Sequence, residues 1–75
     1  MKELVEVIAK ALVNNPDAVV VTETVTERDT ILTLTVDPAD MGKVIGKQGR
    51  IAKAIRTVLK AQAVREDKRV SLDIG

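Results

Sequence analysis

Two glycines three positions apart, Gly46 and Gly49, mark a turn whose residue types and spacing favour contact with an anion. Lys47 lies between the glycines, and Arg50 follows directly. Gly46 is expected to end a helix in a left-handed conformation, and Gly49 lets backbone approach closely just before the next helix begins. The N-terminus of a helix presents unpaired N–H groups and the positive end of the helix dipole, which together favour a phosphate. The sequence therefore predicts a phosphate contact here, with Lys47 and Arg50 reaching the same anion.

The same turn also has a plainer interpretation, because glycine is common in short links between helices. Its surroundings favour the phosphate contact: a short apolar segment, Val44-Ile45, precedes the turn, and a basic stretch without any acidic residue follows it. The basic residues between Asp40 and Glu66 are Lys43, Lys47, Arg50, Lys53, Arg56, Lys60 and Arg65. We assign Lys47 and Arg50 to phosphate contact and interpret Lys60 and Arg65, far from the turn, as solvated side chains.

The net charge of +1 hides an uneven distribution of charge along the chain. Residues 1–40 carry three basic and eight acidic residues, a net charge of −5, whereas residues 41–75 carry nine basic and three acidic residues, a net charge of +6. Such a local excess of positive charge is typical of a surface that binds nucleic acid, even when the whole chain is nearly neutral.

Hydrophobic periodicity and turn residues predict a single α+β domain over residues 1–75. We expect helices over 2–13, from Pro38 to the first glycine, and over 50–64, and strands over 18–26, 30–36 and 69–74. Asp37 is a plausible N-cap for the helix that begins at Pro38. The short link between the first two strands predicts an antiparallel hairpin, and the long helical crossover predicts a parallel third strand. The order is α-β-β-α-α-β, with a three-stranded mixed sheet packed on one face by three helices.

The composition argues against several classes of protein. Histidine, cysteine and aromatic residues are all absent, which removes the commonest general base, the thiolate metal sites and any disulfide. No metal-ligand spacing is present, so we expect no catalytic residue, no metal, no cofactor and no small-molecule substrate. We find no signal peptide and no apolar run that could span a bilayer, and we expect a cytoplasmic protein.

The residues around the two glycines also resemble a known family. The segment Val44-Ile45-Gly46-Lys47-Gln48-Gly49-Arg50 is similar to the V-I-G-x-x-G core of KH domains, and the element order resembles the type II, prokaryotic arrangement. Over its full length the chain is similar to the small bacterial single-KH-domain RNA-binding proteins of the KhpA type. The type I pattern usually has Ile three residues after the second glycine, whereas this chain has the small residue Ala52, as is common in type II domains.

This resemblance implies that the chain binds single-stranded RNA, with the Gly46–Gly49 loop clamping the nucleotide backbone. It implies an RNA chaperone or post-transcriptional regulator, with one apolar wall beside the loop and the other formed by the last strand near Arg69 to Leu72 and by loop 65–68. The implied RNA-binding residues are Lys43, Val44, Ile45, Gly46, Lys47, Gln48, Gly49, Arg50, Ala52 and Lys53. Because no aromatic side chain is available for bases to stack on, we expect little sequence specificity.

An alternative function is a protein-interaction or dimerisation module. The helix over 50–64 is apolar over a wide arc that includes Ile51, Ile55 and Val58, and one small sheet need not cover all of it. Core packing is the simpler explanation of this arc. The resemblance implies a homodimer, or a heterodimer with a second KH-containing protein, and both functions are compatible because dimerising doubles the number of clamps.

Overall fold

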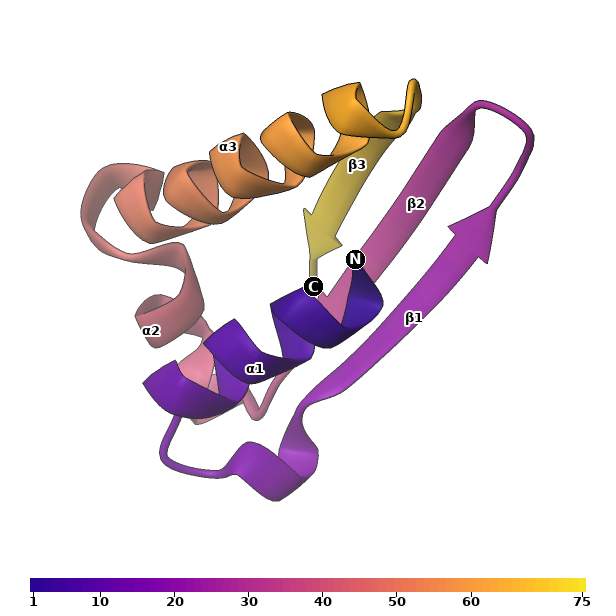
Figure 1. Cartoon of the computed structure of the whole chain (residues 1–75). Coiled ribbons are helices and arrows are strands. Elements are labelled where there is room, and N and C mark those ends of the chain that lie inside the picture. The colour runs from indigo at the N-terminus through magenta and orange to yellow at the C-terminus, as the bar shows by residue number, and fades with distance from the viewer.

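The computed structural model describes all residues from Met1 to Gly75. Its helices and strands follow the order α-β-β-α-α-β that the sequence predicts (Figure 1). The elements are α1 (Lys2–Leu12), β1 (Val20–Val25), β2 (Asp29–Thr35), α2 (Met41–Ile45), α3 (Arg50–Arg65) and β3 (Arg69–Ile74). None of the helices combines the length and the apolar character that a crossing of the lipid bilayer requires.

The three strands form one mixed sheet with β2 in the centre. β1 and β2 pair antiparallel from Val20↔Thr35 to Val25↔Thr30, as expected for a hairpin with a short turn. β2 and β3 pair parallel from Asp29↔Arg69 to Leu34↔Ile74, which leaves the outer edge of β3 unpaired. The predicted sheet topology is therefore confirmed.

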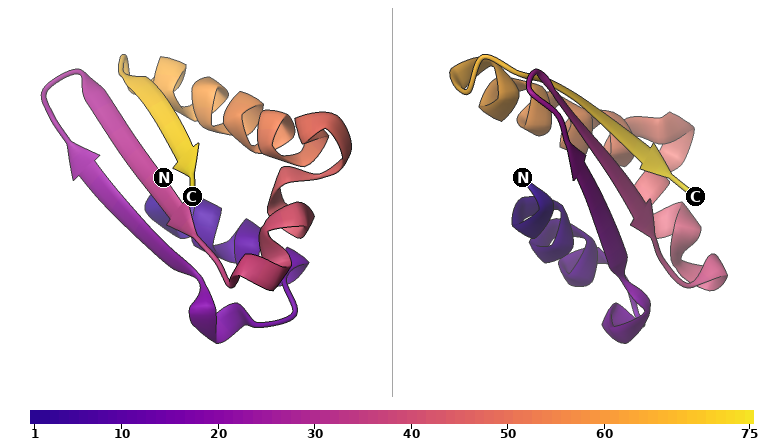
Figure 2. Two further views of the ribbon diagram at one scale, coloured as in Figure 1. Left: turned by 180° about the vertical axis from the view of Figure 1, so that it is seen from behind. Right: turned by 90° about the vertical axis from the view of Figure 1, so that its right-hand side faces the viewer.

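The helices pack on one face of this sheet, and the strands lie in front of α1 and α3 when the molecule is seen from behind (Figure 2). Strict alternation along β2 produces this arrangement, because every second side chain points to the same face. Leu32 and Leu34 are fully buried and meet Val5 of α1, Val44 of α2 and Leu59 of α3 in one core. The chain without aromatic residues thus builds its core from Val, Leu, Ile and Ala alone, as expected.

The first strand begins later than the sequence predicts. β1 starts at Val20 instead of Ala18, because Pro16–Ala18 forms one turn of 3-10 helix. Proline fixes its own backbone at a helical φ and lacks an N–H for strand pairing. The N–H of Val19 donates to the carbonyl of Pro16 at 3.1 Å, so the turn uses a donor that a longer strand would need.

The predicted start of the short helix is confirmed at Asp37. The N–H of Ala39 donates to Oδ1 of Asp37 at 2.9 Å, and Pro38 occupies the first helical position. This first turn is a 3-10 helix over Pro38–Asp40 that leads directly into α2. A capped and proline-fixed start places α2 reproducibly, and α2 in turn carries the glycine loop into α3.

Candidate nucleic-acid interface

Gly46 ends α2 in a conformation that only glycine adopts readily. Its φ is 77° and its ψ is 174°, which is the extended mirror of ordinary strand backbone and not the left-handed helical conformation that the sequence predicted. A Cβ added to Gly46 would lie 2.6 Å from Cγ1 of Ile51, far inside the contact distance of two carbon atoms. Position 46 therefore requires glycine for two separate reasons, which are its backbone conformation and the close packing of Ile51 against it.

The left-handed helical conformation lies instead at the two following residues of the loop. Gln48 has φ 59° and ψ 25°, and Gly49 has φ 75° and ψ 14°. A Cβ at Gly49 would meet nothing within 4 Å, so only its backbone conformation favours glycine there. Lys47 and Gln48 are both exposed at the tip of this turn, where a ligand can reach them.

The loop leads directly into α3, and the positive, N-terminal end of this helix is left open. α3 begins at Arg50 with no side-chain cap and no acidic residue in its first turn. The N–H of Gly49 donates to the carbonyl of Gly46 at 3.1 Å, which closes the loop on itself. An uncapped helix start beside exposed Lys47 and Arg50 favours a negatively charged group, as the sequence analysis expected.

β3 returns next to α3 (Figure 1). A groove of about 340 Å³ is lined by residues of these two elements. Leu59 of α3 with Val70 and Leu72 of β3 supplies its apolar lining, and Arg56 and Lys60 stand on its helix side. Arg56 lies six residues beyond Arg50, about 9 Å along the helix axis at the usual rise per residue. The groove therefore lies on α3 about 9 Å beyond the loop, and no loop residue lines it.

A larger hollow of about 900 Å³ opens at the other end of the molecule, between the β1–β2 turn and the turn after α3. Its lining contains both positively and negatively charged side chains, and Val64 is the one apolar residue in it. Neither the glycine loop nor the groove residues on α3 contribute to this hollow. The residues of α3 that line the groove, Arg56 and Lys60, lie nearer to the glycine loop than Val64 of the hollow, so we take the groove as the candidate site.

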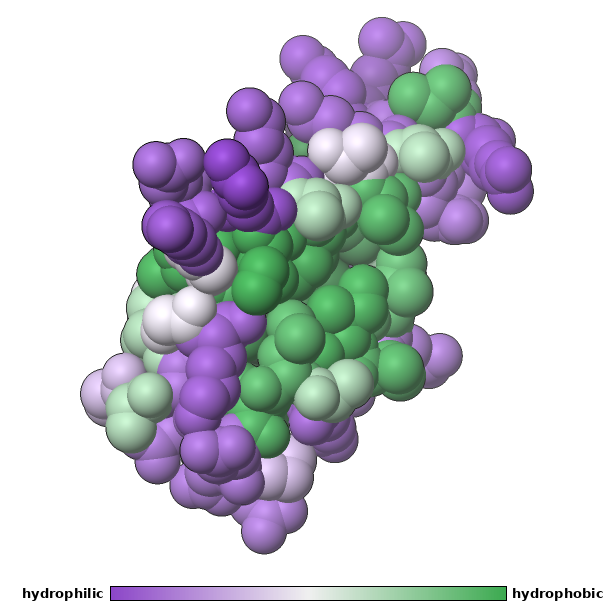
Figure 3. Space-filling view, turned by 90° about the vertical axis from the view of Figure 1, so that its left-hand side faces the viewer, coloured by the Kyte–Doolittle hydropathy of each residue, from purple (hydrophilic) through white to green (hydrophobic).

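α3 separates three kinds of side chain around its axis, since positions recur at 3.6 residues per turn. Ile55 and Leu59 are buried on the core side. The basic residues Arg56 and Lys60 face β3, where they line the groove. Val58, which is 48% exposed, lies on the flank of α3 opposite to Arg56 and Lys60. Figure 3 shows a continuous apolar surface bordered by polar residues on one side of the molecule.

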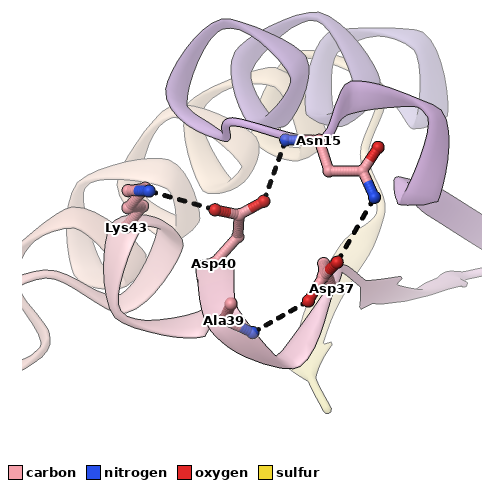
Figure 4. A network of polar contacts seen from close by, with 5 residues as sticks. All are labelled: Asn15, Asp37, Ala39, Asp40 and Lys43. Atoms are coloured by element: carbon pink, nitrogen blue, oxygen red, sulfur yellow. Dashed lines mark hydrogen bonds and ion pairs between the residues drawn. The ribbon is translucent and has the colours of Figure 1, made fainter.

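The buried carboxylate of Asp40 ties α2 to the segment after α1 (Figure 4). Its Oδ2 accepts from the N–H of Asn15 at 3.0 Å, and its Oδ1 accepts from Nζ of Lys43 at 3.1 Å. Burial alone raises the pKa of Asp40, but the hydrogen bonds from Asn15 and Lys43 outweigh burial and hold the pKa below its ordinary value. Asn15 also donates through Nδ2 to Asp37 at 3.3 Å. The start of α2 is thus held by contacts to a segment far away in the sequence.

Comparison with known proteins decides the family. A family model described as KhpA/KhpB, KH domain, matches residues 2–74. The chain belongs to the KhpA/KhpB family of KH domains. KH domains are not a class of enzyme, in agreement with the expectation from the sequence.

Full-length relatives support the same KH family. RNA-binding protein KhpA of Clostridium acetobutylicum is 65% identical over 74 residues, and that of Clostridium perfringens is 64% identical; each alignment covers 99% of both chains. RNA-binding protein KhpA of Aquifex aeolicus is 54% identical, covering 99% of this chain and 94% of the relative. No solved structure matches the chain.

The structure places the predicted RNA-binding residues of this KH domain in three environments. Lys47, Gln48, Arg50 and Lys53 are exposed, around or just beyond the loop. Ile45 and the two glycines are partly buried. Val44 is fully buried and Ala52 is 4% exposed, so both pack inside the protein and support the loop from within. The ammonium of Lys43 is held by Asp40 and stands on the side of α2 that faces Asn15 (Figure 4).

Arg56 and Lys60 line the groove of this KH domain, and the sequence analysis did not select them. The signal that could have found them is the helical wheel of α3, on which Lys53, Arg56 and Lys60 share one side. The helical wheel alone does not show where β3 lies. The position of β3 beside these residues is what makes this face of α3 one wall of a groove. Within the molecule, no three His, Cys, Asp or Glu side chains gather in a way that could hold a metal ion.

Proposed function

We propose that this KH domain binds single-stranded RNA, with the Gly46–Gly49 loop clamping the phosphate backbone and the groove beside α3 receiving the bases. The observation that carries the proposal is the loop itself, whose exposed tip at Lys47-Gln48 is fixed beside the uncapped start of α3. The relatives in Clostridium and Aquifex are RNA-binding proteins by name, which supports the same ligand here.

Each part of the site has a distinct physical role in this proposal. Lys47 supplies a mobile positive charge, whereas Arg50 offers a planar fork that fits a phosphate with two parallel hydrogen bonds. Phosphate contacts position the strand without reading its sequence. In the groove, bases rest against half-buried Val70, with the buried side chains of Leu59 and Leu72 beneath it, in place of aromatic stacking partners.

Backbone contact without strong base stacking suits a protein that binds many different RNAs. We therefore propose the role of an RNA chaperone or post-transcriptional regulator with modest affinity for any one sequence. The mixed sheet with the parallel last strand supports the type II form of the KH domain for this role.

The direct test places negative charge on the tip of the loop without disturbing its backbone. Lys47→Asp combined with Gln48→Asp is suited to this, since both side chains are exposed and aspartate tolerates the left-handed conformation of residue 48. The control is Arg28→Asp, which reverses one exposed charge, as Lys47→Asp does, in the β1–β2 turn at the far end of the molecule (Figure 1).

We expect the loop variant to lose at least about tenfold in affinity for a single-stranded oligonucleotide, from one or two lost charge-assisted contacts. Fluorescence anisotropy measures the affinity, and circular dichroism checks that the fold persists. The control should bind within about twofold of the unchanged protein. Equal affinity of a folded loop variant and the unchanged protein would refute the clamp.

A second candidate function is protein interaction through an exposed apolar surface (Figure 3), which we propose pairs two copies of this chain or this chain with a second KH-containing protein. Val58 of α3 is 48% exposed, and Ile8 of α1 and Ile51 of α3 are half-buried. A monomer of this size gains stability when such a surface is covered.

Sedimentation of Val58→Glu against Val64→Glu tests this pairing. Both changes put one negative charge on an exposed valine of α3, but Val64 is 77% exposed and lines the larger hollow at the far end of the helix. Self-association should be lost with Val58→Glu and kept with Val64→Glu. A monomeric unchanged protein at high concentration, with no KH-containing partner captured, would rule the pairing out.

A further inference from the structure

The outer edge of β3 carries a backbone acceptor that points into the groove. The N–H of Arg69 donates to Arg28 at 2.7 Å and that of Gly75 donates to Leu34 at 3.1 Å, so the peptide groups at these odd-numbered positions face β2. Successive residues of a strand turn their peptide groups to opposite sides, and this alternation aims the carbonyl of Leu72 at the unpaired edge. Leu72 also lines the groove beside α3. A bare edge at this point would offer a hydrogen-bond acceptor to any base that enters.

Arg56 covers that acceptor with two donors. Its Nε donates to the carbonyl oxygen of Leu72 at 3.2 Å, and its Nη2 donates to the same oxygen at 3.0 Å. Two bonds to one atom fix the plane of the guanidinium, and its other N–H groups have no partner within the protein. A guanidinium has donors and no acceptor. The lip of the groove therefore presents donors where the strand edge would otherwise present an acceptor.

We propose that Arg56 determines the base preference of the groove, favouring uracil over adenine at the position beside Leu72. Uracil presents carbonyl acceptors to the free N–H groups of Arg56. Adenine presents an amino donor beside its ring acceptor, and this amino group meets the guanidinium donors instead of the covered carbonyl. The inference rests on the proposed function, and it adds one discriminating contact to a site that otherwise holds the backbone.

The experiment compares two unstructured oligonucleotides of equal length, oligo(U) and oligo(A), on the unchanged protein and on Arg56→Met. Methionine keeps an unbranched apolar side chain against the groove, removes the donors and uncovers the carbonyl of Leu72. We expect the ratio of the affinity for oligo(U) to that for oligo(A) to fall by about five- to tenfold in this variant, the worth of one or two hydrogen bonds. Stacking within oligo(A) affects both proteins alike and cancels in this comparison.

Arg65→Met is the matched control, because it removes an equal charge from an exposed position at the end of α3. It should weaken both oligonucleotides by the same factor and leave the ratio unchanged. If Arg56→Met does not fold, the Nε–H resonance of Arg56 in the unchanged protein gives the answer. This resonance should shift more with oligo(U) than with oligo(A), and equal shifts would overturn the inference.

The outcomes separate this inference from the proposed function. If the unchanged protein binds neither oligonucleotide, the proposed function fails and the inference fails with it. A second outcome is that the unchanged protein binds, that Lys47→Asp weakens binding, and that Arg56→Met leaves the affinity ratio unchanged. In that case the clamp stands and the role of Arg56 in base choice is refuted. Arg56 would then only protect the strand edge from pairing with other chains.

Discussion

The two loop glycines are predicted to respond differently to substitution, although they look equivalent in the sequence. Gly46 combines φ 77° and ψ 174°, a backbone region that essentially only glycine occupies. Gly49 has φ 75° and ψ 14°, the left-handed helical conformation that asparagine also tolerates. We therefore compare alanine and asparagine at both positions.

The expected free energies follow from this geometry. Gly49→Ala should lower the free energy of unfolding by about 1 kcal/mol, the usual cost of a left-handed residue, because the new methyl group meets nothing. Gly46→Ala adds a clash with Ile51 at 2.6 Å to a conformational cost of about 1–3 kcal/mol, which together amount to about 3 kcal/mol or more. In a domain of this size, each kcal/mol lowers Tm by about 4–8 °C.

Thermal unfolding followed by circular dichroism measures these differences. Gly49→Asn should unfold close to the unchanged protein, whereas Gly46→Asn should be as damaging as Gly46→Ala. In an Ile51→Ala background, part of the cost of Gly46→Ala should disappear, because Cγ1 and Cδ1 of Ile51 are then absent. Equal losses at the two glycines, or an asparagine tolerated equally well at both, would refute the structural reasoning.

Two further predictions concern electrostatics. RNA affinity should fall with salt, with a slope of log K against log salt of about −2 to −3 if three or four phosphates are neutralised, and Lys47→Asp should make this slope shallower by about 0.7; a slope near zero would argue against phosphate contact. Because the folded-state pKa of Asp40 is lowered, its stabilising contribution is present above the unfolded pKa and is lost as pH falls through the folded pKa. In urea unfolding, the Asp40→Asn variant should therefore be less stable than the unchanged protein at neutral pH, and its stability should change less as the pH is lowered. Parallel pH profiles of the two proteins would contradict this assignment.

The order of elements could be predicted from the sequence because each one has a local cause. Alternation fixes β2, Pro38 with Asp37 fixes the start of the short helix, and Gly49 precedes α3 at the expected residue. The conformation of the loop could not be predicted in detail. Gly46 was expected to be left-handed, and its actual ψ depends on how closely α3 packs against α2 at Ile51.

Contacts between segments far apart in the sequence were also beyond local reasoning. Asp40 directly precedes α2, but its buried carboxylate accepts from Asn15, 25 residues earlier. Arg56 reaches the carbonyl of Leu72 across 16 residues, and this pair exists only because β3 returns next to α3 in one register. Sequence periodicity assigns a side chain to a face of its helix, and the tertiary fold decides what that face meets.

The arrangement of side chains on α3 predicts that pairing and RNA binding do not compete. Arg56 and Lys60 face the groove at β3, whereas Val58 lies on the opposite flank of α3. Substitutions that share no partner generally act independently. Val58→Glu should therefore leave the affinity for a short oligonucleotide, long enough for one clamp, within about twofold of the unchanged protein.

A long oligonucleotide should respond differently to the same substitution. If two copies pair, a strand that spans both clamps gains avidity from the second contact, with no new kind of interaction. Val58→Glu should then weaken binding of the long strand by about tenfold or more while sparing the short one, and Val64→Glu should spare both. Anisotropy titrations with both strand lengths provide the measurement. An equal loss on short and long strands would mean that Val58 acts through the groove, and the separation of the two surfaces on α3 would be wrong.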